Sequence, residues 1–217
     1  MINILLKAFI DKNSKYRFIK QLPIGTELLD VGCGNHSPSK ANYLNKSIFI
    51  DGIDIVEYNM NSLDKSILRN YFIVSKSNFN LFIKNIKTNY QAIVCSHVLE
   101  HVDEHTELLE ILLDKLAPNG QLYISFPNYN SIKFPSRKGT LNFFDDETHF
   151  KSPPDINIIE KIILQKGCKI INKSVPNKPF LGYILGLLIE PFSRLQRKVL
   201  PFTWYYWGFE NVYIIKK

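Results

Sequence analysis

A glycine-rich loop and a later acid could together hold an adenosine-containing ligand. Gly32 and Gly34 follow the apolar run 28–31, and their missing side chains let the backbone approach a ligand closely and point its N–H groups at it. Asp54 ends the next apolar run, where a carboxylate can accept hydrogen bonds from ribose hydroxyls. Alone, this pattern predicts the class of ligand and does not select the cofactor.

His149 is the candidate general base of this sequence. It follows three acids at 145–147 and precedes a predicted helix over 154–166. Histidine titrates nearest to neutral pH, which suits it to taking a proton from a hydroxyl acceptor. The alternative is a structural role, in which His149 caps the helix or packs under a lid.

A second group of histidines raises the question of a metal. Residues 97–101 read H-x-x-E-H, as in some zinc peptidases, and His97, His101 and His105 recur at a spacing that shares one helix face. Because the pattern directly follows an apolar strand and nothing nominates a further ligand, we predict no metal site. Glu100 and His101 then stand at a helix start, His105 lies at the surface, and the acids of 100–114 form a solvated helix face.

Hydrophobic periodicity predicts the elements that position these residues. The expected strands are 28–31, 47–55, 71–74, 90–96, 121–126, 168–172 and 211–215. The expected helices are a short amphipathic one over 1–17, then 103–116 and 154–166. Strands that alternate with helices indicate an α/β fold with a mostly parallel sheet, which binds ligands at the carboxyl ends of its strands.

Five motifs in order resemble those of class I S-adenosylmethionine-dependent methyltransferases, particularly the group that includes the ubiquinone-biosynthesis O-methyltransferases. They are LLDVGCGN at 28–35, IDGIDI at 50–55, AIVCSHVLEHV at 92–102, LAPNGQLYISFPN at 116–128 and DDETHFKSP at 145–153. The chain departs from that pattern at His36 and Ala92, and the acid that often contacts adenine after the third strand is not evident.

The resemblance implies a Rossmann-like seven-stranded sheet with helices on both faces, an antiparallel last strand and S-adenosyl-L-methionine as cofactor. It implies that Asp30, Gly32 and Gly34 line the methionine end of the cofactor, and that Ser96 and His97 lie near it. The predicted cofactor-binding residues are therefore Asp30, Gly32, Cys33, Gly34, Asp54, Ile55, Ser96 and His97. For the Cys33 side chain, packing is a better account than a reactive thiol.

Composition limits the setting of the protein. The three cysteines are widely spaced and form no C-x-x-C pair, which predicts reduced thiols in a cytoplasmic protein. The whole net charge of +7 falls on residues 151–217, which favours an anionic acceptor or a membrane surface as partner. Lys and Arg form no dense run, and no nucleic-acid module is visible, so we predict no nucleic-acid partner.

The sequence predicts a single methyltransferase domain over 1–217, with an apolar and basic insertion at 175–209. The insertion serves as a lid, as a homodimer contact or, through 180–207, as a peripheral contact with the inner face of a membrane. The predicted function is methyl transfer to a small or lipid-linked acceptor by direct displacement. The alternatives are an NAD- or nucleotide-sugar-binding oxidoreductase or epimerase, against which the missing third glycine of G-x-G-x-x-G argues, and a catalytically silent Rossmann-like binding module.

Overall fold

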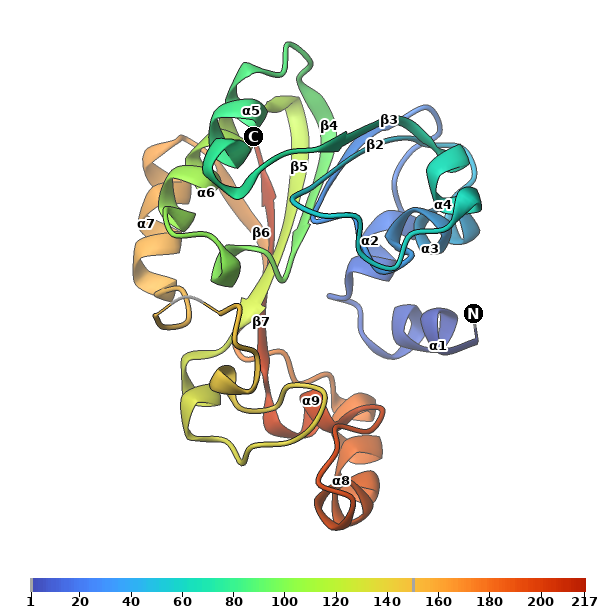
Figure 1. Ribbon diagram of the computed structural model, residues 1–217, viewed down its shortest axis with the longest axis vertical. Coiled ribbons are helices and arrows are strands. Elements are labelled where there is room, and N and C mark those ends of the chain that lie inside the picture. Colours follow the sequence, from blue (N-terminus) through green and yellow to red (C-terminus); the bar gives the residue numbers. More distant parts are fainter. Residues whose placement is uncertain (1, 150) are drawn as a thin grey trace.

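Strands β1 to β7 form one sheet in the order β3-β2-β1-β4-β5-β7-β6 (Figure 1). Their bounds are β1 Glu27–Val31, β2 Phe49–Asp54, β3 Leu68–Ile73, β4 Tyr90–Ser96, β5 Leu116–Pro127, β6 Lys169–Ser174 and β7 Glu210–Lys216. The computed structural model describes residues 2–149 and 151–217; Met1 and Phe150, the latter part of the 145–153 motif, lie outside them. Strands β1 to β5 pair in parallel, and β7 runs antiparallel to both β5 and β6. The predicted Rossmann-like sheet with an antiparallel last strand is confirmed.

Helices cover both faces of the sheet. Their bounds are α1 Ile2–Ile10, α2 Lys15–Lys20, α3 Ser37–Leu44, α4 Ser62–Ile67, α5 Phe79–Asn85, α6 His105–Asp114, α7 Ile156–Gln165, α8 Phe180–Leu195 and α9 Thr203–Trp207. Successive strand side chains point to opposite faces, so Leu29 and Ile93 pack with α5, α6 and α7, whereas Leu28 and Val94 pack with α2 and α3. The core therefore has two layers separated by the sheet.

The N-terminal segment differs from the single helix that its sequence predicts. It forms α1 and α2, separated at residues 11–14, where the Ser14 side chain accepts a hydrogen bond from the Arg17 N–H and caps α2. The Asp11 carboxylate likewise accepts a bond from the Asn13 N–H at 2.8 Å. Side chains that satisfy backbone groups locally compete with a continuous helix, which explains the break.

The insertion lies where the sequence places it. Residues 175–209 leave the sheet after β6, form α8 and α9, and return at the start of β7. Figure 1 shows α8 and α9 beyond the end of the sheet at which β7 begins, with α1 in the same half of the molecule. Within residues 2–149 and 151–217, no helix combines the length and hydrophobicity that crossing a membrane requires.

Candidate functional site

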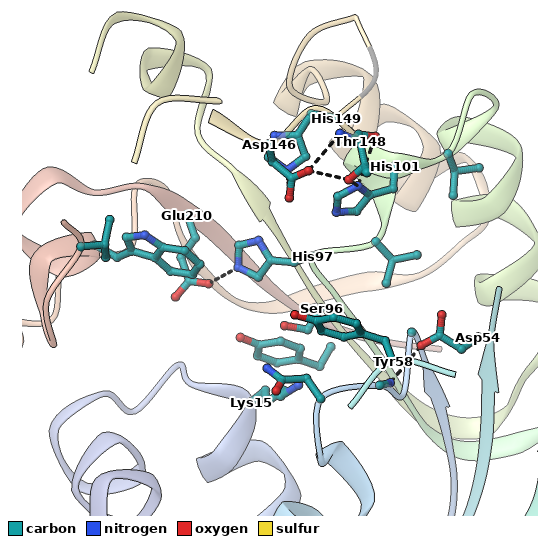
Figure 2. Close-up of a pocket in the computed structure, with 18 of the residues that line it drawn as sticks. Lys15, Asp54, Tyr58, Ser96, His97, His101, Asp146, Thr148, His149 and Glu210 are labelled. Atoms are coloured by element: carbon teal, nitrogen blue, oxygen red, sulfur yellow. Dashed lines mark hydrogen bonds and ion pairs between the residues drawn. The ribbon is translucent and has the colours of Figure 1, made fainter. Parts of the chain in front are cut away.

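A cavity of about 1300 Å³ opens at the carboxyl ends of β1, β2 and β4. Its wall combines the glycine loop, the end of β2 and the end of β4 with parts of α1, α2, residues 146–149 and the insertion at 199–205. Figure 2 shows Asp54, Ser96 and His97 on the sheet side of this space and His149 on the loop above it. A cavity of this size has room for more than one small ligand.

The loop after β1 requires glycine at two positions. Gly32 has a φ of +73°, and an added Cβ there would stand 2.5 Å from Val98 Cγ2. At Gly34 an added Cβ would meet the Tyr58 carbonyl oxygen at 3.0 Å and Asp54 Oδ2 at 3.1 Å. These glycines therefore bring backbone against the cavity with no side chain in the way.

The N–H groups of the same loop do not point at a ligand, contrary to the sequence-based expectation. Gly32 and Cys33 donate to the Ile53 carbonyl oxygen, and Gly34 donates to Asp54 Oδ2 at 2.9 Å. The next two N–H groups, at residues 35 and 36, donate to carbonyl oxygens of residues 58 and 59. The last two acceptors belong to the loop after β2, which lies over the glycine loop. All five N–H groups from residue 32 to residue 36 therefore have acceptors within the protein.

Asp54 lies at the cavity with its carboxylate held in place. Oδ1 accepts the Ile55 N–H at 2.7 Å and Oδ2 accepts the Gly34 N–H. Each carboxylate oxygen has a further lone pair, and both Asp54 and Ile55 line the cavity. The carboxylate is therefore oriented before any ligand arrives.

Asp30 and Cys33 do not line the cavity, unlike the other predicted cofactor-binding residues. Asp30 is buried in β1, and its burial raises the pKa of its carboxyl group. The Cys33 side chain is buried as well and packs toward β2, where a Cβ on Gly52 would meet its sulfur at 2.8 Å. Both side chains are therefore buried in the protein interior next to the glycine loop and not in the cavity. Cys33, Cys95 and Cys168 are all free and buried.

His97 sits at the end of β4 between two carboxylates. Its Nδ1 lies 3.0 Å from Glu100 Oε1, and its Nε2 lies 3.0 Å from Glu210 Oε2. Burial disfavours the imidazolium, but the two hydrogen bonds and the two negative charges outweigh it and raise the pKa of His97 to about 9. His97 is therefore a cation at neutral pH, with both of its N–H groups occupied. Its neighbour Ser96, also in the cavity wall, bonds Ser125 at 2.9 Å between hydroxyl oxygens.

The predicted base, His149, meets a second histidine in the cavity wall. His149 Nδ1 bonds the Phe143 carbonyl oxygen and therefore donates, which leaves Nε2 as an acceptor, 3.9 Å from Asp146 Oδ2. His101 lies beside it, with ring centroids 4.8 Å apart, and its Nδ1 is 2.9 Å from the Thr148 hydroxyl. The Thr148 hydroxyl donates its hydrogen to Asp146 Oδ1 at 2.6 Å, so it accepts a hydrogen bond from His101 Nδ1. This leaves Nε2 of His101 free among the described residues.

The two histidines of the H-x-x-E-H pattern and His105 do not share one helix face. His97 has a φ of +55° and is followed by the single 3-10 turn Leu99–His101, and α6 starts only at His105. His97 thus turns to Glu210, whereas His101 turns to His149, and His105 is half-buried rather than fully exposed. Glu100 is buried, contrary to its prediction as part of a solvated face.

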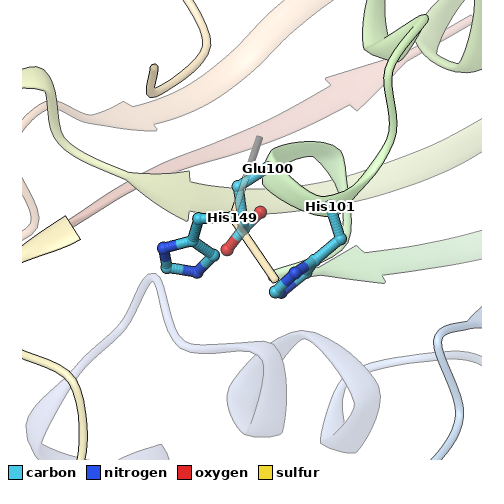
Figure 3. Close-up of side chains that lie close together, drawn as sticks. All are labelled: Glu100, His101 and His149. Carbon is cyan, nitrogen blue, oxygen red and sulfur yellow. The ribbon is translucent and has the colours of Figure 1, made fainter. Parts of the chain in front are cut away.

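A different set of residues converges instead, as Figure 3 shows. Glu100, His101 and His149 offer ligand atoms that all lie within 4.8 Å of one another. Two ligand atoms that bind one zinc ion at about 2.1 Å each lie no more than about 4.2 Å apart, so the set would have to contract slightly to hold an ion. The prediction of no metal stays a prediction.

Several cavity residues escaped the sequence analysis. Lys15 and Tyr58 carry no recognisable motif, and Glu210 is the first residue of β7, far along the chain from its partner His97. Trp204 belongs to a run of four aromatic residues, 204–207, in the insertion, and its ring centroid lies 5.1 Å from that of His97. Among these residues, only that aromatic run was a sequence signal that could have located part of the cavity wall.

Comparison with known proteins identifies the family and the fold. A family profile described as a methyltransferase domain matches residues 5–172. The mitochondrial ubiquinone biosynthesis O-methyltransferase of Homo sapiens is 26% identical over 181 residues, which cover 78% of this chain and 46% of that protein. The chain thus spans about half the length of this curated relative.

Solved structures share the fold across the whole chain. The S-adenosylmethionine-dependent methyltransferase of Archaeoglobus fulgidus superposes with a TM-score of 0.56 at 20% identity, covering 99% of this chain and 94% of that one. The cyclopropane synthase MmaA2 of Mycobacterium tuberculosis superposes with a TM-score of 0.58 at 16% identity, covering 100% and 83%. At these identities the structures show the shared fold.

Proposed function

This chain belongs to the methyltransferase-domain family and has the fold of its S-adenosylmethionine-dependent class, and on that premise we propose that it transfers a methyl group from S-adenosylmethionine to a small or lipid-linked acceptor. The observation that carries the proposal is the juxtaposition, in one cavity, of the glycine loop, Asp54 and the histidine pair His101 and His149. The first two belong to the cofactor side and the last two to the acceptor side.

The glycine loop favours this cofactor over a dinucleotide. A dinucleotide pyrophosphate needs backbone N–H donors at the start of the helix after β1. The N–H groups from Gly32 to His36 all bond acceptors within the protein, so none is left for phosphate oxygens. S-Adenosylmethionine carries no phosphate, and it needs from this loop mainly a surface without side chains.

The cofactor side of the cavity fits its parts. Asp54 would accept the ribose hydroxyls with lone pairs that its two backbone bonds leave free. Gly32 and Gly34 would lie against the methionine portion, with Ser96 and His97 beside it. When bound, S-adenosylmethionine would supply an electrophilic methyl group, and its positively charged sulfur would be the leaving group in an in-line displacement by the acceptor.

On the acceptor side, His149 is the residue we assign to proton removal. Its Nδ1 is fixed on a backbone carbonyl, so the free Nε2 can take the proton of an acceptor hydroxyl as the new O–C bond forms and the C–S bond breaks. His97 is unsuited to this step because both of its nitrogens are engaged and it is already protonated. His101, with a free Nε2, is the neighbour from which mutagenesis must separate His149.

A ligand panel tests the proposed cofactor. We expect S-adenosylmethionine and S-adenosylhomocysteine to raise the melting temperature, with about 2.7 kcal/mol of added stability at 100 times the dissociation constant. NAD and nucleotide sugars should leave it unchanged. Stabilisation by NAD and not by S-adenosylhomocysteine would overturn the proposal, and no response to any of these ligands would indicate a silent binding module.

A further inference from the structure

Helix α8 is amphipathic in the opposite sense to a normal surface helix. The residues that it buries are small or polar, namely Gly182, Gly186, Glu190 and Ser193. The exposed residues are apolar and recur every three or four positions, at Leu181, Ile184, Leu187, Leu188, Phe192 and Leu195. A water-soluble helix usually turns its apolar stripe to the core, so this stripe needs a partner outside the described chain.

The structure prevents α8 from turning that stripe inward. A Cβ on Gly182 would lie 2.5 Å from the Tyr205 ring, and one on Gly186 would lie 2.5 Å from the Phe202 carbonyl oxygen, because α9 packs directly on the helix. Further along, Glu190 bonds Arg137 through both carboxylate oxygens, at 2.6 and 2.8 Å. These contacts fix which face of α8 is exposed.

Helix α1 adds further exposed apolar residues next to α8. It packs against α8 and exposes Leu5, Leu6 and Phe9, with Phe9 75% exposed. We call the exposed apolar residues of α1 and α8 the α1–α8 face. The segments that carry this face also form part of the cavity wall, because Lys7 of α1 and Leu200, five residues after the end of α8, line the cavity.

The charges around the α1–α8 face identify its partner. The segments 2–12 and 180–201 contain five cations, Lys7, Lys12, Arg194, Arg197 and Lys198. Their two acids, Asp11 and Glu190, are both buried. The segments that carry the face therefore expose basic residues and no acid. A second copy of this chain would bring like charges together, whereas an anionic lipid surface would meet apolar residues with acyl chains and cations with phosphates.

We infer that the α1–α8 face docks on an anionic lipid bilayer and sets the mouth of the cavity at the lipid surface, where a lipid-linked acceptor can enter. The entry of such an acceptor rests on the proposed function, but the docking does not. Because the helices lie on the surface rather than cross it, the binding is reversible and depends on both burial and charge.

Co-sedimentation with phosphatidylcholine vesicles, with and without phosphatidylglycerol, tests the docking. We expect binding only to the anionic vesicles, falling as salt rises. Leu188→Glu should weaken it at least tenfold, since it places a charge where an apolar side chain enters the lipid. The matched control is Leu164→Glu on α7, which has nearly the same exposure, 66% against 64%, and should bind as the wild type does.

A second pair of variants tests the charges. Arg194→Glu combined with Lys198→Glu removes two basic residues, each contributing about 1 kcal/mol at an anionic surface, so affinity should fall at least about 30-fold. Lys161→Glu combined with Lys169→Glu makes the same change in net charge at exposed positions on another part of the surface and should bind normally. Calorimetry with S-adenosylhomocysteine on every variant confirms folding and measures the cofactor site separately from docking.

Three results would overturn the inference. One is a wild-type protein that ignores anionic vesicles at low salt. Another is equal loss of binding in the test and control variants. The third is a stable dimer in sedimentation equilibrium that Leu188→Glu dissociates, which would assign the face to a second copy. If vesicle binding behaves as expected while S-adenosylhomocysteine fails to bind, the docking holds and only the proposed function fails.

Discussion

Raising the pH should destabilise this protein through one histidine. His97 is paired with Glu100 and Glu210, and its side chain is 25% exposed, so water screens the charges only in part. Its pKa in the folded protein, about 9, exceeds the ordinary 6.5. The folded state therefore binds a proton that the unfolded chain has already lost at intermediate pH. At about 1.4 kcal/mol for each tenfold difference in proton affinity, the ion pairs of protonated His97 contribute about 3 kcal/mol to the free energy of unfolding.

The direction of the effect follows from that difference. Because the folded pKa is the higher one, the contribution is fully present below about pH 6.5 and is lost as the pH rises through about 9. Glu210 has the opposite dependence: burial alone would raise its pKa, but the hydrogen bond and charge of His97 lower it, so its contribution is lost only as the pH falls through its lowered pKa. The decline above neutral pH thus belongs to His97 and not to its partner.

Urea unfolding at a series of pH values measures this decline. The free energy of unfolding of the wild type should fall by about 3 kcal/mol between about pH 6.5 and 9 relative to His97→Gln, which lacks the titrating group. His105→Gln is the control, because burial lowers the pKa of His105, and this variant should keep the alkaline decline. If His97→Gln declines as steeply as the wild type, the ion pairs do not hold His97 protonated and the account of the site given above is wrong.

Three substitutions test the other parts of the site. Asp54→Ala removes the proposed ribose acceptor and should cost about 1.5–3 kcal/mol of S-adenosylhomocysteine binding in a folded protein; unchanged affinity by calorimetry would take Asp54 out of the site. For a hydroxyl acceptor, His149→Ala should lower turnover by about 10²–10⁴ with cofactor affinity nearly unchanged, whereas full turnover would leave His149 a structural role. Arg137→Met leaves the buried Glu190 carboxylate without its ion-pair partner and should lower the free energy of unfolding by about 3–5 kcal/mol. Adding Glu190→Met should largely restore the stability, and an Arg137→Met variant as stable as the wild type would contradict this.

Local sequence signals predicted the sheet well. The β4 span 90–96 is the same in the sequence and in the structure, and the insertion 175–209 fills the interval between β6 and β7. These elements are marked by apolar runs with Gly, Pro and Asn at their ends, which act over a few residues. The β5 span was less accurate, because β5 begins at Leu116, within what periodicity assigns to the preceding helix.

Long-range partners account for what the sequence could not predict. Glu100 lies in the 3-10 turn before α6 and is buried, unlike the exposed acids that follow, with its carboxylate bonded to His97 three residues earlier. The second partner of His97, Glu210, comes from a strand 113 residues later. Likewise, His101 and His149 meet through Thr148, on a loop 47 residues away from His101. Periodicity describes one element at a time and carries no information on such pairs.

The buried polar residues show how the acceptor side is attached to the cofactor side. Asn177 at the start of the insertion donates to Asp11 Oδ2 at 2.7 Å and to Glu210 Oε1 at 3.3 Å, and Glu210 in turn bonds His97. This chain of bonds joins the end of α1, the insertion and the sheet at one place. A buried network that is this connected fixes one arrangement of its members, since loosening one leaves the others unpaired.

Only part of this cavity wall lies within the family profile. The family profile ends at residue 172, before the insertion, and the glycine loop and Asp54 lie within it. The cavity wall at Leu200, Phe202 and Trp204 lies outside it. Under the proposed function, the acceptor side therefore combines a histidine pair that the profile covers with the wall of the insertion, which it does not cover. Substitutions at Leu200 and Phe202 should accordingly change which acceptor is used before they change cofactor affinity.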